Sequence, residues 1–301
     1  LARAGRARRL LRGARIGRVG ENPDGFESCL WDPEGLKRRF GLDVVQMDLA
    51  RVFAEARSVP GEQVDTVMRE LAGRLDGLDE LDGEATRRTL RVFAALRQLA
   101  ARQGLHGLAV RCWPEFFTEM GCAACGAMSM LSDELVPCSC EADVNGTITQ
   151  FILQAISGEP AFGADLVAFD AEEDCAVLWH CGLAPLSMAD PSARPRGTVH
   201  SNRQLPLLME FPLKPGRVTL ARLSEATGAY RLVVGSGQML AARLSFSGTS
   251  GVLRFDRPAV EALDTMMTEG LEHHLSLTYG DYAPALVALA AWLEIPVLHL
   301  A

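Results

Sequence analysis

The chain has 301 residues, of which 48% are hydrophobic and 23% are charged, and its formal net charge is -8. This composition fits two folded domains with hydrophobic cores and excludes a largely disordered protein. The acidic charge argues against a general nucleic-acid binder, because phosphate binding needs a basic surface. The sequence lacks an apolar run of the ~18 residues that span a bilayer and lacks a hydrophobic signal region. We therefore expect a cytoplasmic protein that binds neither nucleic acid nor membrane.

The first part of the sequence alternates between short apolar runs and amphipathic stretches. The pattern predicts strands over residues 15–20, 43–48 and 108–112, and helices over residues 1–14, 33–40, from 49, 64–75 and 84–102. Such alternation is typical of a parallel sheet covered by helices. The turn-forming loop 21–25 follows the first strand, so it lies where such sheets bind ligands. For the arginine-rich helix 1–14, a solvated basic face is favoured over a nucleic-acid arm.

The stretch Cys138–Gly146 is the most informative part of the sequence. A short strand over 136–140 ends there, and apolar residues at helical spacing follow, so a buried helix starts near Asn145. Glu141 and Asp143 therefore lie at a strand-to-helix corner, which is where α/β sheets usually bind ligands. Asp143 or Asn145 also suits the N-cap of that helix, and this stretch taken alone favours the cap over a ligand-binding role.

A second carboxylate follows the predicted strand 108–112. Trp113 and Pro114 end this strand, which places Glu115 in the next loop, beside two phenylalanines. Taken alone, Glu115 is better explained as a surface residue next to an aromatic cluster than as a site residue. A helix over 123–133 is then expected to lead back to the corner.

Eight cysteines are present, and five of them lie between Cys112 and Cys140. The pairs Cys122/Cys125 and Cys138/Cys140 loosely imitate a zinc site. The second pair is too closely spaced, and the segment between the pairs is apolar and helical. Free thiols in a reduced interior are therefore the favoured interpretation, with structural zinc as the alternative.

The character of the sequence changes near residue 165. Short strands are predicted over 163–169, 175–180, 207–213, 217–224 and 230–235, followed by helix 258–269, strand 273–279, helix 284–293 and strand 296–300. We expect a mostly β, barrel-like region in which the polar segment 187–204 forms a flap. His180, at a strand end, is a candidate ligand or a structural histidine. His274 lies on the opposite face of its strand from the leucines that follow.

Five motifs occur in a fixed order: Cys112-Trp-Pro-Glu-Phe116, Cys140-Glu-Ala-Asp-Val-Asn-Gly146, Trp179-His-Cys-Gly182, Phe211–Ser224 and His273-His-Leu-Ser-Leu-Thr-Tyr-Gly280. From about residue 105 onwards the chain resembles the superfamily of L-fucose isomerase and L-arabinose isomerase. The resemblance implies a parallel-sheet α/β domain over 1–137, the family's second domain, and a β-rich C-terminal domain over 138–301 that carries metal ligands. It also implies that the family's first domain lies outside this sequence or is missing.

The resemblance further implies an aldose–ketose isomerase that uses a divalent metal ion, usually Mn²⁺, held by two acids and a histidine. Carried over, these ligands are Glu115, Asp143 and His274, with Glu119 as the alternative first acid. Glu115 and Asp143 are then also the candidates for moving a proton between C1 and C2 of the sugar through a cis-enediol. The residues of second rank, for substrate binding, are Glu141, His180 and Trp113.

Other functions fit the same sequence. A non-catalytic sugar-binding protein on the isomerase scaffold is the alternative function, and an epimerase is possible within the enzyme class. The expected partner is a small-molecule sugar, and the resemblance implies a homo-oligomer, either a trimer or a hexamer. The identity of the sugar does not follow from the motifs.

Overall fold

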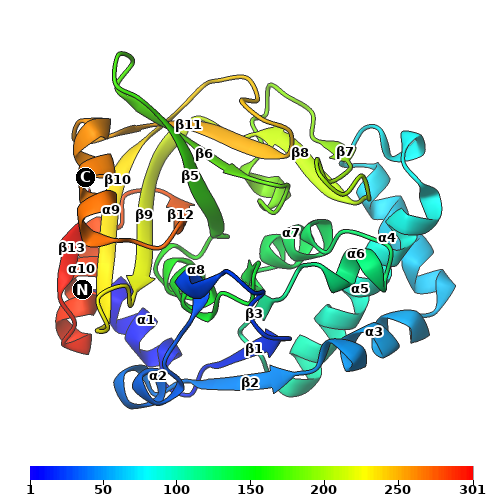
Figure 1. Cartoon of the computed structure of the whole chain (residues 1–301), viewed down its shortest axis with the longest axis horizontal. Coiled ribbons are helices and arrows are strands. Elements are labelled where there is room, and N and C mark those ends of the chain that lie inside the picture. The colour runs from blue at the N-terminus through cyan, green and yellow to red at the C-terminus, as the bar shows by residue number, and fades with distance from the viewer. Residues whose placement is uncertain (301) are drawn as a thin grey trace.

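The computed structural model describes residues 1–300 and contains a parallel sheet and a larger β-rich part (Figure 1). The parallel sheet has the order β2-β1-β3-β4. Its strands are β1 (Arg15–Val19), β2 (Asp43–Met47), β3 (Gly107–Val110) and β4 (Cys138–Ser139). Strand β3 is buried along its whole length, as expected for a parallel strand covered on both faces. The predicted α/β part of the fold class is confirmed.

Eight α-helices belong to this part of the chain: α1 (Ala2–Leu11), α2 (Pro33–Phe40), α3 (Leu49–Ser58), α4 (Gly61–Ala72), α5 (Gly83–Gln103), α6 (Glu115–Thr118), α7 (Cys125–Asp133) and α8 (Val144–Ser157). Three short 3-10 segments occur at Glu27–Cys29, Leu78–Glu80 and Leu186–Met188. The expectation that Glu115 lies in a loop is wrong, because Glu115 begins α6 directly after Pro114. Proline is well tolerated at a helix start, where its missing N–H has no helical partner.

The β-rich part contains β5 (Phe162–Asp170), β6 (Cys175–His180), β7 (Arg196–Thr198), β8 (Leu208–Pro212), β9 (Gly216–Ser224), β10 (Arg231–Leu240), β11 (Thr249–Phe255), β12 (His274–Tyr279) and β13 (Val297–His299). Helices α9 (Ala259–Glu269) and α10 (Ala283–Leu293) lie between its last strands in the sequence. Strand β10 pairs with both β9 and β11, and this closes the ring β9-β12-β5-β6-β11-β10. The expected barrel-like β-rich region is therefore confirmed.

Strand β11 was not predicted from the sequence, although it completes this ring. Its first residues, Thr249, Ser250 and Gly251, follow a segment rich in serine and glycine, a composition typical of a loop. They become a strand because β6 and β8 lie on either side and pair with them. The tertiary partners, rather than local propensity, decide the structure here.

Helix α8 connects the two parts, as Figure 1 shows at the centre of the molecule. It contacts β1 and β3 on one side and β9 and β12 on the other. All of its residues from Val144 to Ile156 are buried. The expected domain boundary after residue 137 stays a prediction, and we note that β4, which follows it, pairs with β3 in the parallel sheet. Within residues 1–300, none of the helices combines the length and hydrophobicity needed to cross a bilayer.

Candidate functional site

The corner between β4 and α8 is a strained turn. Glu141 and Ala142 both adopt left-handed backbone conformations, with φ of 57° and 53°. Such conformations are uncommon for residues other than glycine, and they persist only where the surroundings hold them. Asn22 supplies that support, because its Nδ2 donates hydrogen bonds to the carbonyl oxygens of Glu141 (2.8 Å) and Ala142 (3.2 Å). The loop after β1 therefore fixes the direction of the Glu141 side chain.

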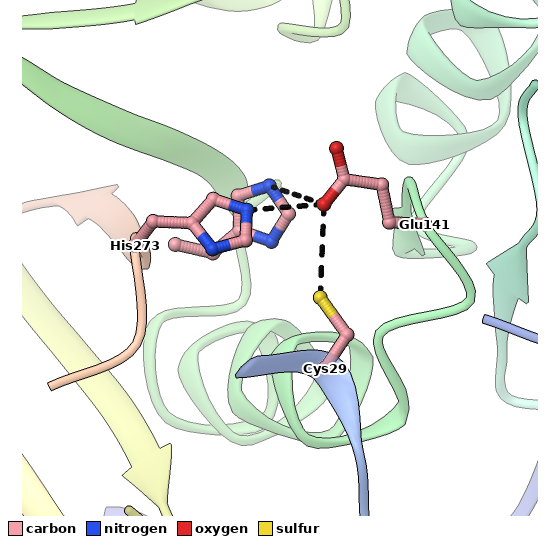
Figure 2. Close-up of side chains that lie close together, drawn as sticks. Cys29, Glu141 and His273 are labelled. Carbon is pink, nitrogen blue, oxygen red and sulfur yellow. Dashed lines mark hydrogen bonds and ion pairs between the residues drawn. The ribbon is translucent and has the colours of Figure 1, made fainter. Parts of the chain in front are cut away.

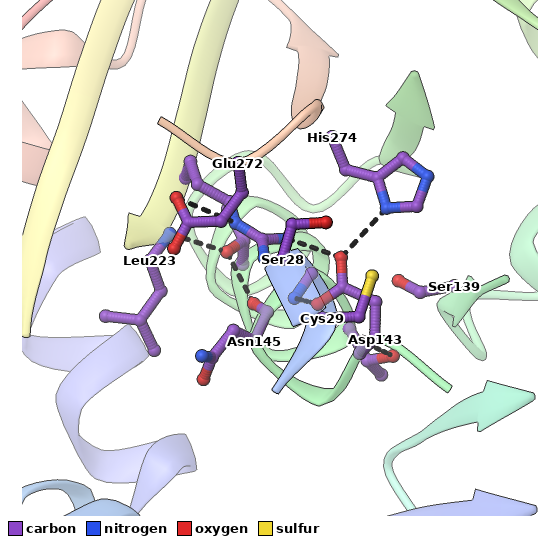
Figure 3. Close-up of polar contacts among 12 residues, drawn as sticks. Ser28, Cys29, Ser139, Asp143, Asn145, Leu223, Glu272 and His274 are labelled. Carbon is purple, nitrogen blue, oxygen red and sulfur yellow. Dashed lines mark hydrogen bonds and ion pairs between the residues drawn. The ribbon is translucent and has the colours of Figure 1, made fainter. Parts of the chain in front are cut away.

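Asp143 lies directly after this turn and is completely buried. Its Oδ1 accepts the backbone N–H of Gly146 at 2.8 Å, so it is the N-cap of α8. Its Oδ2 forms an ion pair with Arg222, which is only 1% exposed, and contacts His274 Nδ1 at 3.0 Å (Figure 3). Burial alone would raise the pKa of Asp143, but Arg222 and His274 outweigh it and hold this pKa well below its usual value. The carboxylate is therefore ionised and fully partnered.

His274 presents a free ring nitrogen because of this contact. Nδ1–H donates to the Asp143 carboxylate, which leaves the lone pair on Nε2. Within 4 Å of Nε2 lie Asp165 Oδ1 (3.6 Å), Glu141 Oε2 (3.8 Å) and Cys140 Sγ (3.5 Å). The Asp165 Oδ1 atom is buried and lacks a hydrogen-bond partner within residues 1–300. A histidine oriented by a carboxylate and facing further donors is the usual arrangement of a metal ligand.

Glu141 lies between Cys29 and His273, as Figure 2 shows. Its Oε2 accepts a hydrogen bond from His273 Nε2 at 3.0 Å and lies 3.7 Å from Cys29 Sγ. The other ring nitrogen of His273, Nδ1, is 2.9 Å from Ser28 Oγ. Burial alone would lower the pKa of His273, but the hydrogen bond to Glu141, together with the negative charges of Glu141, Asp165 and Asp143, outweighs it and raises this pKa. Glu141 and His273 thus form a half-buried acid–base pair.

Two groups of side chains bring three or more potential metal donors within 4.8 Å of one another: Cys29, Glu141, His273 and His274, and also Cys140, His180 and His274. The second group fits a metal ion less well. His180 Nδ1 accepts the backbone N–H of Cys181 at 2.9 Å, so the ring proton is on Nε2, which points at Cys140 Sγ. A protonated Nε2 has no lone pair for a metal ion.

The structure therefore brings four of the predicted site residues together: Glu141, Asp143, His180 and His274. Glu115 is paired with Arg111, whose Nε lies 2.8 Å from Glu115 Oε2. This hydrogen bond outweighs partial burial and lowers the pKa of Glu115. Within residues 1–300, Glu115, Asp143 and Asp165 all lie outside these two groups of potential metal donors, although Asp165 Oδ1 is 3.6 Å from His274 Nε2.

Trp113 lies at the rim of the site, and the alternative acid Glu119 does not contribute to it. The Trp113 ring contacts Phe26 at a centroid distance of 5.6 Å, and Phe26 contacts His273 at 6.1 Å. Glu119 is exposed, and its carbonyl oxygen accepts a hydrogen bond from Arg57. Trp113 is therefore placed to contact a ligand that reaches His273.

Sequence reasoning missed several residues of the site: Asn22, Cys29, Asp165, Arg222 and His273. One signal was available for Arg222, because it is an arginine inside the apolar strand β9 and needs a buried counter-charge. The His273-His274 doublet was another signal, because His273 directly precedes β12 and both rings lie within 4 Å of the Glu141 carboxylate. Asn22 lies in loop 21–25, which the sequence places at the ligand-binding edge of the sheet without marking this residue, whereas nothing in the local sequence indicates a role for Cys29 or Asp165.

Comparison with known proteins identifies a matching family model and several similar proteins. Residues 178–300 match the family model described as L-fucose isomerase, C-terminal domain. The chain is 33% identical over 290 residues to a sulfoquinovose isomerase of Alkalicoccus urumqiensis. The aligned region covers 95% of this chain and 64% of the relative. It is 33% identical over 291 residues to the sulfoquinovose isomerase of Priestia megaterium (strain ATCC 12872 / QMB1551), covering 96% of this chain and 65% of the relative.

A sulfoquinovose isomerase of Clostridium sp. (strain MSTE9) is 29% identical over 295 residues, covering 97% of this chain and 66% of the relative. The chain thus spans slightly less than two thirds of the length of these relatives. The motifs, the fold and the sequence matches agree along nearly the whole chain. The chain is thus similar to sugar isomerases of the fucose isomerase-like superfamily, through the family match over residues 178–300 and through these relatives.

Proposed function

We propose that this chain carries the active site of a metal-dependent aldose–ketose isomerase. The observation that carries the proposal is the free Nε2 of His274, oriented by Asp143 and facing Glu141 and Asp165. The relatives named sulfoquinovose isomerase support the same reaction class. They also favour a sulfonated aldose as the substrate.

The donor atoms around His274 fit a hard divalent ion such as Mn²⁺. His274 Nε2 and Asp165 Oδ1 would hold the ion, and the buried Asp165 oxygen without a hydrogen bond supports this assignment. When bound there, a divalent ion polarises the sugar carbonyl and stabilises negative charge on its oxygen. In this proposal Asp143 orients His274, and Arg222 keeps Asp143 ionised.

Glu141 and His273 are the groups that move protons. Glu141 removes the proton from C2 of the open-chain aldose and returns it to C1, while His273 donates a proton to O1 and takes one from O2. The product is the ketose, reached through a cis-enediol without net gain or loss of protons. The raised pKa of His273 keeps it charged, and therefore a donor, further into the neutral range. The turn held by Asn22 keeps the Glu141 carboxylate in place.

Proton exchange in D₂O tests this proposal. The chain is loaded with Mn²⁺ and incubated with sulfoquinovose, and deuterium at C2 and ketose formation are followed by NMR. Glu141→Gln is expected to reduce exchange at least about 1,000-fold, because the amide cannot accept the proton. Glu119→Gln is the matched control, since this exposed carboxylate lies outside the site.

Exchange by Glu141→Gln at the parent rate would contradict the role of Glu141. If the parent binds the sugar without exchanging the C2 proton, the non-catalytic binding protein becomes the better account. The homo-oligomer implied by the family resemblance is part of the proposal, and sedimentation equilibrium measures it.

A further inference from the structure

A wall of aromatic side chains leads away from the proposed proton-transfer pair. It begins at His273, which contacts Phe26, and continues to Trp113. Phe117, in α6, and His200 form its far end, with their ring centroids 5.1 Å apart. His200 also lies beside Cys181, which directly follows His180. The segment that carries His200 therefore lies over the same site as His180 and His273.

Arg203 belongs to this segment and stacks on the wall. Its guanidinium carbon lies 5.3 Å from the ring centroid of Trp113 and 5.7 Å from that of Phe117. The side chain is exposed, and within residues 1–300 it has no carboxylate oxygen within 4.0 Å. Two other arginines of the flap differ, because Arg194 pairs with Asp76 and Arg196 pairs with Glu80.

This difference leaves the guanidinium of Arg203 with its hydrogen-bond donors available. Stacking on two aromatic rings restricts the side chain, so less conformational entropy is lost when it binds an anion. A planar guanidinium forms paired hydrogen bonds with two oxygens of a tetrahedral oxyanion such as sulfonate. The aromatic wall offers an apolar surface to the C–H groups of a sugar between Arg203 and His273.

We propose that Arg203 is the specificity-determining residue that binds the anionic terminal group of the sugar, with Trp113 and Phe117 holding the guanidinium in place. The inference rests on the proposed isomerase function, in which Glu141 and His273 act at C1 and C2. The substrate class is then an aldose with a sulfonate at the carbon farthest from the carbonyl. Sulfoquinovose, in which sulfonate replaces the 6-hydroxyl of glucose, belongs to this class.

Ligand binding and turnover are measured separately for four proteins: the parent, Arg203→Gln, Arg203→Lys and the matched control Arg194→Gln. The probes are sulfoquinovose and glucose, a neutral sugar with the same ring. We expect the parent to bind sulfoquinovose more tightly than glucose, and Arg203→Gln to weaken sulfoquinovose binding about 10- to 100-fold. Glucose binding stays unchanged in Arg203→Gln, Arg203→Lys retains part of the preference, and Arg194→Gln behaves like the parent.

Kinetics sharpen this test, because the proposed contact lies away from the reacting carbons. The KM for sulfoquinovose should rise in Arg203→Gln while kcat changes less than about threefold. Higher salt should reduce the preference of the parent for sulfoquinovose, since the guanidinium is exposed and screened.

An equal preference for sulfoquinovose in the parent and in Arg203→Gln would overturn the inference, and so would a parent that binds both sugars equally. These outcomes are distinct from failure of the proposed function. A binding preference for sulfoquinovose that depends on Arg203, without any C2 proton exchange, supports the inference and contradicts the proposed isomerase function. C2 exchange on glucose without a preference for sulfoquinovose supports the isomerase function and overturns the inference about Arg203.

Discussion

Two carboxylates that the sequence assigns to one metal site lie in very different surroundings. Asp143 is completely buried, caps α8 and pairs with Arg222 and His274. Glu115 is at the start of α6, with its side chain 24% exposed and one arginine as its partner. Both carboxylates have lowered pKa values. Burial opposes this lowering strongly for Asp143 and weakly for Glu115. Depth of burial, rather than the presence of a charged partner, separates the two.

The comparison shows what each carboxylate can do. Asp143 has its oxygens committed to Gly146, Arg222 and His274, so its main effect is to orient other groups. Glu115 can exchange its partner at little cost, because an exposed ion pair contributes little free energy. The carboxylates placed to act directly, Glu141 and Asp165, are half-buried and face His274 Nε2.

The largest expected effect is the loss of stability when Asp143 is removed. Asp143→Ala removes the helix cap and leaves the buried Arg222 guanidinium with only its longer contact to Glu272, at 3.8 Å. We expect the free energy of unfolding to fall by about 3–5 kcal/mol, measured by urea denaturation. Adding Arg222→Met to Asp143→Ala should restore part of this loss, because an apolar side chain does not need Asp143 as a counter-charge. No recovery in the double variant would argue against the ion pair as the cause.

Lowering the pH should weaken the contacts of Asp143 with Arg222 and His274 and so reduce the free energy of unfolding. The pKa of Asp143 is lower in the folded chain than in the unfolded chain, so the ionised group contributes stability above its unfolded pKa of about 3.9. This contribution is lost as the pH falls through that range towards the folded pKa. The free energy of unfolding should therefore decrease between about pH 5 and pH 3, and the slope should be smaller in Asp143→Asn. An unchanged slope would contradict the low pKa.

A smaller effect is expected at the strained turn. Asn22→Ala removes the donors that satisfy the carbonyl oxygens of Glu141 and Ala142. We expect a loss of about 1–3 kcal/mol in the free energy of unfolding and a larger fractional loss of C2 proton exchange. If stability falls while exchange is unaffected, the turn does not position Glu141.

The smallest effect is expected for Glu115. Glu115→Gln removes an ion pair that is partly exposed, so the free energy of unfolding should change by less than about 1 kcal/mol. Metal affinity should also stay within about twofold of the parent, as calorimetry can show. A loss comparable to that of Asp143→Ala would remove the contrast between the two sites.

The sequence predicted the local elements of the fold better than their tertiary contacts. The helix after Asp143, the alternation around the parallel sheet and most barrel strands follow from hydrophobic spacing and turn residues. Strand β11 could not be predicted in this way, because its polar first half becomes a strand only through pairing with β6 and β8. The pairing of β10 with β11, which closes the ring, likewise depends on contacts between distant segments.

For the site, the strand-to-helix corner and His274 could be found from sequence, because motifs and residue spacing mark them. The interpretations of Asp143 as cap and as site residue are compatible, since it caps α8 and orients His274. Asp165, 109 positions before His274, could not be found, because only the antiparallel pairing of β5 with β12 places them opposite each other. The proposal that Glu141 rather than Glu115 moves the proton likewise rests on three-dimensional distances.

A calorimetric Mn²⁺ titration of the parent, His274→Gln, Asp165→Asn and Glu115→Gln tests the central claim most directly. We predict about one ion per chain for the parent and Glu115→Gln, and at least about 100-fold weaker binding for His274→Gln and Asp165→Asn. Circular dichroism of each variant confirms that it is folded. Binding that survives both the His274 and Asp165 substitutions, or that is lost in folded Glu115→Gln, would contradict a metal site at His274.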